Sequence, residues 1–157
     1  MGTNTMQMAS VETSAGTAIC CAPSRIAPLP DYIASDTPKN NDSLVLRIAY
    51  GRRAFLLSGD VERPIERRML EEDEVQAADV LKVAHHGSKT SSTEEFLSAV
   101  HPLFAVISVG FENSYGHPNR DILERLAQHH AALLRTDERG LITIRTDGRC
   151  LEVETWR

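Results

Sequence analysis

Short apolar segments, each ended by glycine or polar residues, recur along the chain from residue 43 onward. Residues 43–50 alternate between two sets of side chains, and Gly51-Arg52 separates them from the apolar residues 53–58, which predicts a β-hairpin. Residues 80–84 and 103–109 are mostly apolar, as in strands buried on both faces. We expect strands at residues 17–22, 43–50, 53–58, 80–84, 103–109, 132–135, 141–145 and 150–155.

Segments with helical periodicity lie between these strands. Residues 61–74 have Pro64 in a first turn, residues 92–95 (STEE) form a capping box for a short helix, and residues 119–130 are amphipathic. The residues expected to face inward are Ile65, Met69 and Leu70; Phe96, Leu97 and Val100; and Ile122, Leu123, Leu126 and Ala127. This order of strands and helices predicts an α/β protein with a mixed β-sheet and flanking helices.

The N-terminal region has no such periodicity. Residues 1–16 are small and polar and are expected to be disordered, so that a single domain spans residues 17–157. Residues 23–42 hold four prolines and predict a long surface loop. Residues 137–140 (DERG) and 147–148 (DG) are typical of turns.

Composition removes several classes of function. The net charge of −5 gives no general attraction for nucleic acid, so a phosphate-binding role needs a local basic patch or a metal. Cys20, Cys21 and Cys150 lack zinc-ribbon spacing and are expected to be reduced packing residues. No apolar run approaches the ~20 residues of a membrane span, and no secretory signal is present, so the default expectation is a cytoplasmic location.

Candidate chemistry follows the ends of three apolar segments, where Asp60, the His85-His86 pair and His117 are found. Taken singly, Asp60 is also typical of a helix N-cap, one of the paired histidines of a core residue, and His117 of a surface loop. Because strand ends of an α/β sheet gather at one edge, the combination favours a hydrolytic metal site. In such a site a carboxylate can bridge two ions, imidazoles bind them, and a bound water becomes hydroxide near neutral pH.

The surroundings of the histidine pair refine this hypothesis. Neighbouring residues on a strand point to opposite faces, so only one of His85 and His86 is expected to reach a given metal unless the strand has bent. Residues 88–91 (SKTS) add hydroxyl groups and one positive charge, as in an anion or phosphate pocket. Three other histidines lie at helix C-terminal ends, which the helix dipole favours, and no catalytic role is expected for His101, His129 and His130.

Four segments resemble the C-terminal half of the metallo-β-lactamase-like domain of ComEC-type DNA-uptake proteins. They are NDSLVLRIAYGRRAFLLSGDVE, ADVLKVAHHGSKTSSTEEFL, PLFAVISVGFENSYGHPN and LLRTDERGLITIRTDG, and they cover about three quarters of the chain from Asn41 onward. The most specific feature is AHHGSKTS followed at this spacing by SYGHP. The HHG element after a Gly-Asp also resembles other members of the superfamily, such as phosphorylcholine esterases.

The resemblance implies part of an αββα sandwich and metal-dependent hydrolysis of DNA or another phosphodiester, with two divalent ions, zinc or manganese, in the complete domain. By this resemblance Asp60 is the carboxylate that bridges the two ions. The His85-His86 pair supplies one metal ligand from late in the domain sequence and one contact to the substrate. His117 becomes a further ligand or a contact to the phosphate. The resemblance leaves open which histidine of the pair faces the metal; we assign Asp60 and His86 as ligands and His85, His117 and Ser88 to catalysis.

The resemblance is incomplete in one respect. The His-x-His-x-Asp-His motif, which the superfamily carries in the N-terminal half, is absent from the sequence. We therefore expect a domain whose N-terminal half is missing, with weak or no metal binding and no activity alone, completed by the missing half or by self-association. The family domain is tethered to a membrane protein, whereas this chain has no membrane segment of its own. The alternatives are an inactive fragment or interaction module, and a different esterase similar to phosphorylcholine esterases.

Overall fold

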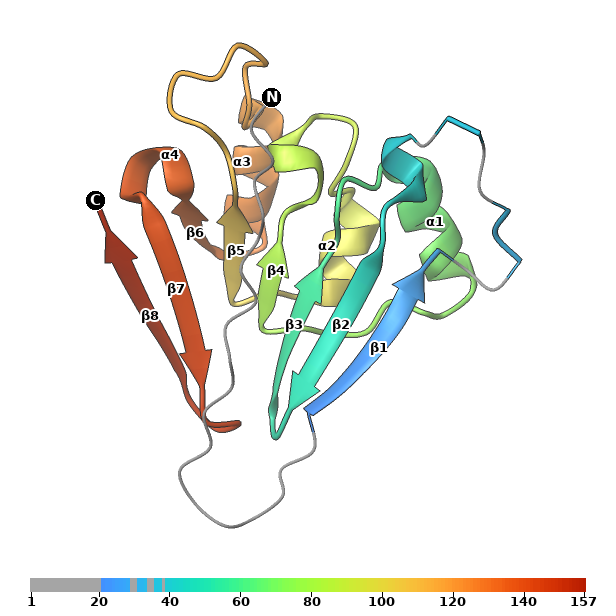
Figure 1. The fold of residues 1–157 in the computed structure, drawn as a ribbon, viewed down its shortest axis with the longest axis horizontal. Helices are drawn as coiled ribbons and strands as arrows, with labels where there is room; N and C mark the ends of the chain where they lie inside the picture. Colours follow the sequence, from blue (N-terminus) through green and yellow to red (C-terminus); the bar gives the residue numbers. More distant parts are fainter. Residues whose placement is uncertain (1–20, 29–30, 34–35, 38) are drawn as a thin grey trace.

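A computed structural model describes residues 21–28, 31–33, 36–37 and 39–157. Within these residues, six strands form one sheet in the order β1-β2-β3-β4-β5-β6, and β7 and β8 form a separate hairpin (Figure 1). The strands are β1 (Cys21–Ala27), β2 (Val45–Tyr50), β3 (Arg53–Leu57), β4 (Val80–Lys82), β5 (Phe104–Ile107), β6 (Ala132–Arg135), β7 (Leu141–Thr146) and β8 (Leu151–Trp156). The helical elements are η1 (Asn40–Asp42), α1 (Arg63–Glu71), η2 (Ala84–Gly87), α2 (Glu94–Val100), α3 (Arg120–Gln128) and α4 (Thr136–Arg139).

The sheet is mixed, with the change of direction at β3. Strands β1, β2 and β3 are antiparallel neighbours, whereas β3, β4, β5 and β6 run parallel and are joined by α1, α2 and α3. These three helices lie behind the sheet in Figure 1, on one of its faces. The predicted α/β class, the hairpin and the flanking helices are thus confirmed. The loops that follow β3, β4 and β5 share one edge of the sheet, because the carboxyl ends of parallel strands meet there.

The main core fills the space between the sheet and these helices. Leu56, Leu81 and Ile107, one from each central strand, are at most 1% exposed and belong to one apolar cluster with helix residues. The predicted inward residues of α1 and α2 are buried or partly buried, and so are three of the four predicted for α3. Ala127 is exposed instead, because Ile122 and Leu126 define the buried stripe of α3 and the next residue turns away from it.

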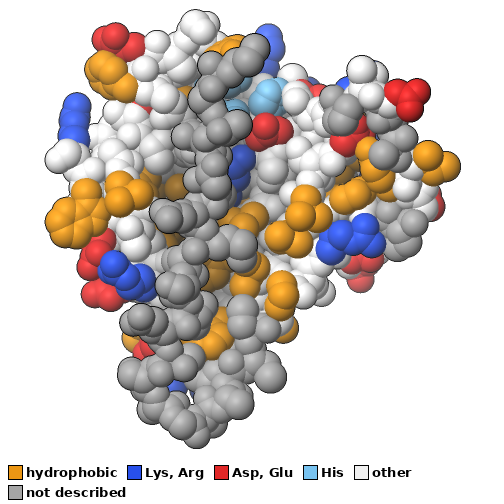
Figure 2. Space-filling model, viewed as in Figure 1, with side chains coloured by type: hydrophobic (Ala, Val, Ile, Leu, Met, Phe, Trp, Pro, Cys, Tyr) orange, Lys and Arg blue, Asp and Glu red, His pale blue; other side chains and the backbone are white. Residues whose placement is uncertain are grey.

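The opposite side of the sheet carries a different set of apolar residues, which we call the second face: Phe55, Leu57, Phe104 and Val106. They alternate with the core residues on β3 and β5, are only partly buried and lie outside the main cluster. Figure 2 shows apolar side chains spread over this side of the molecule.

The β7–β8 hairpin reaches from the end of β6 to the β2–β3 turn. There the N–H of Arg52 donates to the carbonyl oxygen of Gly148 at 2.7 Å, and Nε of Arg53 donates to that of Arg149 at 2.7 Å. Gly51 has φ +60°, and a Cβ on it would lie 2.5 Å from the Gly148 oxygen. Only glycine therefore fits this crossing of the two turns.

The N-terminal predictions were partly wrong. Residues 23–27 were expected in a loop but continue β1, including Pro23. Strand β1 is hydrogen-bonded only to β2 among the described residues, and an edge strand tolerates a proline because the missing N–H can face away from the ladder. The strand expected at residues 17–22 coincides with β1 only at residues 21–22. Its first part and the expected disorder of residues 1–16 lie outside the described residues.

Two smaller features also differ from expectation. The helix cap is Thr93 rather than Ser92: the Thr93 hydroxyl accepts the N–H of Phe96 at 3.4 Å, while Ser92 has φ +52°. Of residues 137–140, expected as a turn, the first three belong to α4, a single helical turn that ends at Arg139 and is followed by Gly140 as its C-cap.

Candidate active site

The His85-His86 pair lies in a strained turn rather than on a strand. The strand expected at residues 80–84 ends at Lys82, and both histidines adopt left-handed backbone angles, with φ +47° and +55°. Such angles are costly for residues other than glycine and persist where surrounding contacts impose them. Here the N–H of His85 donates to the carbonyl oxygen of Gly59 at 3.2 Å, and the Ser91 hydroxyl donates to that of Ala84 at 3.1 Å. Because the two histidines are not on a strand, the expectation that their rings point to opposite faces of the sheet does not apply to them.

The His86 ring lies beside Asp60. Its Nε2 is 3.8 Å from Oδ1 of Asp60, and its Nδ1 is 2.6 Å from the carbonyl oxygen of Ser108. A carbonyl oxygen only accepts, so Nδ1 must carry the proton. In the neutral ring Nε2 then keeps its lone pair, on the side of the ring that faces the carboxylate. An imidazole oriented through its Nδ1–H by a carbonyl is the arrangement that metal-binding histidines use.

The His85 ring lies between an acid and a second histidine. Its Nδ1 is 3.4 Å from Oε1 of Glu62, and its Nε2 is 3.3 Å from the side-chain nitrogen of Asn40. The ring centroids of His85 and His117 are 5.8 Å apart. Burial lowers the pKa of His117 below its ordinary value, and the nearby His85 and His86 lower it further, so His117 is neutral at pH 7.

The loops that carry these histidines are packed directly on each other. The N–H of Asn119 donates to the carbonyl oxygen of Gly87 at 2.8 Å. Gly87 has φ +80°, and a Cβ on it would lie 2.7 Å from Cβ of Pro118. The glycine after the histidine pair is thus required for the close approach of the loop that carries His117.

Lys82 is a site residue that sequence reasoning missed. Its ammonium group donates to the carbonyl oxygen of Gly59 at 2.8 Å and to Oδ1 of Asp60 at 3.3 Å. Burial lowers the pKa of Lys82, and the attraction and hydrogen bond of Asp60 oppose that shift. The available signal was a single cation inside the apolar run VLKVA, which is costly to bury without a partner.

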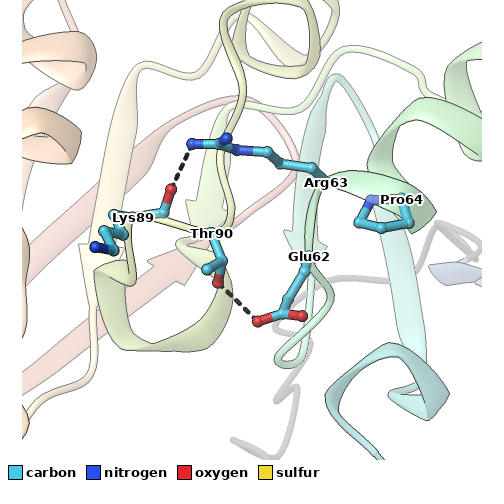
Figure 3. Close-up of a pocket in the computed structure, with 5 residues that line it drawn as sticks. All are labelled: Glu62, Arg63, Pro64, Lys89 and Thr90. Carbon is cyan, nitrogen blue, oxygen red and sulfur yellow. Dashed lines mark hydrogen bonds between the residues drawn. The ribbon is translucent and has the colours of Figure 1, made fainter.

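A cavity of about 470 Å³ lies next to the histidine turn and is lined by Glu62, Arg63, Pro64, Lys89 and Thr90 (Figure 3). The Thr90 hydroxyl donates to Oε1 of Glu62 at 2.7 Å, and the Arg63 guanidinium donates to the carbonyl oxygen of Lys89 at 2.7 Å. Ser88, assigned to catalysis from the sequence, is 6% exposed, and its hydroxyl lies 3.0 Å from that of Thr90. It therefore contributes to the shape of the loop.

The described residues do not make a complete metal centre. In this part of the chain no group of three or more His, Cys, Asp or Glu residues is arranged to hold a metal ion. Asp60 and His86 have the right chemistry for two ligands, but Lys82 is hydrogen-bonded to the same oxygen of Asp60 that faces His86. Among the described residues, the site therefore brings together one carboxylate and one imidazole of the kinds that bind metal ions.

The chain is similar to several larger bacterial proteins. The chain is 43% identical over 111 residues to ComE operon protein 3 of Bacillus subtilis, an alignment that covers 71% of the chain. It is 39% identical over 104 residues to Competence protein ComA of Neisseria gonorrhoeae and 35% identical over 118 residues to Recombination protein 2 of Haemophilus influenzae, with 66% and 75% of the chain covered. Over the aligned residues the chain is homologous to the ComEC-family competence proteins.

The homology is limited in extent. The matched region is 14 to 15% of the length of these three relatives, which are much larger proteins. No family model matches the chain, and no solved structure matches it significantly. Among the described residues, every helix is too short or too polar to cross a lipid bilayer.

Proposed function

We propose that this chain forms one wall of the active site of a metallo-β-lactamase-fold hydrolase that cleaves phosphodiester bonds, with DNA as substrate. The observation that carries the proposal is the His86 ring, whose Nδ1–H is fixed by Ser108 and whose Nε2 faces Asp60 at 3.8 Å. The relationship to DNA-uptake proteins supports a polynucleotide as the substrate.

In this proposal each side chain of the wall has a separate role. Asp60 and His86 each supply one ligand to a divalent ion, zinc or manganese. The other ligands would come from a His-x-His-x-Asp-His segment, a motif that this sequence does not contain. His85 and the neutral His117 lie on the substrate side and offer N–H groups to a phosphate oxygen. Lys82 balances the charge of Asp60 beneath them, at 3.3 Å.

The test combines this chain with a segment of a metallo-β-lactamase-fold hydrolase that carries the His-x-His-x-Asp-His motif. With manganese or zinc, we expect the mixture to cleave a labelled DNA oligonucleotide that neither part cleaves alone. Asp60→Asn and His86→Ala should each lower the rate by at least about 100-fold, the upper end of the cost of losing an outer-shell partner. His130→Ala, an exposed histidine outside the site, is the matched control. Unchanged cleavage by the Asp60 and His86 variants would refute the proposal.

A docking module without catalysis is the second candidate function. The observation that favours it is the incomplete ligand set among the described residues, together with the partly buried second face. Calorimetric titration of the chain with manganese and zinc separates the two functions. Tight binding of two ions would exclude the docking module. Weak binding that is unchanged in Asp60→Asn, with no cleavage in the combined assay, would favour it.

A further inference from the structure

The loop between β5 and α3 holds two aromatic rings in solvent. Phe111 and Tyr115 are 71% and 82% exposed, although large aromatic side chains are normally buried. Their neighbours in the loop are small or polar: Gly110, Glu112, Asn113, Ser114 and Gly116. Among the described residues no aromatic contact joins Phe111 to Tyr115, so the two rings do not pack on each other.

The side chain of Asn113 fixes the conformation of this loop. Its amide nitrogen donates to the carbonyl oxygens of Gly110 at 3.3 Å and His117 at 2.6 Å. Its amide oxygen accepts the N–H groups of Tyr115 at 3.2 Å and His117 at 3.0 Å. The exposure of Tyr115 is thus built into a loop whose backbone is tied to the histidine of the site.

The Tyr115 ring extends the row of histidine rings. It is nearly parallel to the His117 ring, with an interplanar angle of 19° and centroids 6.2 Å apart, and the His117 and His85 centroids are 5.8 Å apart. The His117 ring occupies one face of Tyr115, and with 82% of the residue exposed the opposite face is the one open to a stacking partner. A Cβ on Gly110 or Gly116 would meet no atom within 4 Å, so space around the loop is open.

We propose that Tyr115 is a stacking platform for an unpaired nucleobase whose phosphate lies at His117 and His85. The inference rests on the function proposed above and adds that the substrate is single-stranded at this position. A single isolated ring is enough for a nucleobase to stack on, and any of the bases can do so, because each has a flat aromatic face. The core of a protein interface instead needs a contiguous apolar area, which this loop lacks. Glu112 is the single charge in the loop, and it weakens the binding of a polyanion.

The test measures binding of the 157-residue chain in the presence of a chelator, so that hydrolysis does not enter. The probes are a fluorescein-labelled thymidine octamer and an abasic deoxyribose-phosphate octamer of the same charge. We expect the thymidine octamer to bind about 5- to 150-fold more tightly, the range given by one stacked base. Tyr115→Ala should remove this preference, and Tyr115→Phe, which keeps the ring, should retain it.

Two further variants separate stacking from charge. Lys89→Ala should weaken both octamers by the same factor, because Lys89 is an exposed cation beside the histidine turn and attracts the phosphates that both octamers carry. Glu112→Gln should strengthen both. If Lys89→Ala removed the preference for the thymidine octamer, the selective contact would lie elsewhere and the inference would be wrong.

Several outcomes would overturn the inference. They are no measurable binding of either octamer, equal binding of both, and a preference that survives Tyr115→Ala. A change of oligomeric state in Tyr115→Ala, with octamer binding unchanged, would show that the ring meets a protein surface instead. Failure of the proposed hydrolysis is distinguishable: a Tyr115-dependent preference without any cleavage in the combined assay would leave the stacking site and remove the catalytic function.

Discussion

The two faces of the six-stranded sheet differ in how fully their apolar side chains are buried. On the helix-covered face, Leu56, Leu81 and Ile107 are at most 1% exposed. On the second face, Phe55 and Leu57 of β3 remain partly exposed. Burial of apolar area contributes about 25 cal/mol per Å². The helix-covered face is therefore the main source of stability, and the apolar side chains of the second face contribute less.

The largest expected effect comes from two neighbouring leucines on β3 that point to opposite faces. Leu56→Ala should lower the free energy of unfolding by about 2–5 kcal/mol, because it leaves a cavity in a closely packed core. Leu57→Ala should cost about 1 kcal/mol, because the side chain is already partly in water. Urea denaturation followed by circular dichroism measures both. Equal losses would mean that the second face is as well packed as the first.

The sequence predicted the helix-covered face better than it predicted the site. The i, i+4 spacing of Ile122 and Leu126 predicted the buried side of α3 correctly, and the apolar residues 53–58 predicted a strand but not its alternating burial. The turn at His85 and His86 could not be found this way, since it depends on contacts with Gly59 and Ala84 and not on local preference.

Partners of site residues were also beyond local patterns. Lys82 contacts Asp60 and Glu62 contacts His85, and the two residues of each pair are at least 22 positions apart in the chain. The position of Pro23 in strand β1 was not predicted for a related reason. A proline is excluded from a strand only where the sheet needs a backbone N–H at that position, and this depends on whether the strand lies at an edge. These features depend on which elements become neighbours in the folded sheet.

The next largest expected effect is a pH dependence of the free energy of unfolding, which arises from a carboxyl group buried under the helix-covered face. Glu66 on α1 is fully buried; its two oxygens accept the N–H groups of Ser92 at 2.5 Å and Thr93 at 2.8 Å. Burial raises the pKa of Glu66, while those bonds and the charge of Arg125 oppose the shift. Between the pKa of the unfolded chain and the raised pKa, the native state holds more protons. The free energy of unfolding should therefore fall as pH rises through this window.

Glu66→Gln should remove this part of the pH dependence. At pH 7 the variant should lose about 1–3 kcal/mol, because a neutral amide offers one acceptor for two buried N–H groups. Chemical denaturation at a series of pH values from 4 upward measures both effects. Glu71→Gln, on the exposed side of the same helix, should leave the slope unchanged. A slope that persists in Glu66→Gln would mean that another group titrates, and that water reaches Glu66.

The smallest effect on stability should come from the second face, where the effect on association should be clearest. Phe104→Gln should lower the free energy of unfolding by about 1 kcal/mol or less, because the ring is already partly exposed. If the second face pairs with a second copy of the chain, Phe104→Gln should interrupt that apolar surface and shift the chain toward a smaller species in sedimentation velocity. Phe111→Gln is the matched control, an exposed phenylalanine in the loop after β5. If Phe111→Gln dissociated the chain and Phe104→Gln did not, the self-association surface would lie in the loop and not on the sheet. That result would also count against a nucleobase as the partner of the loop.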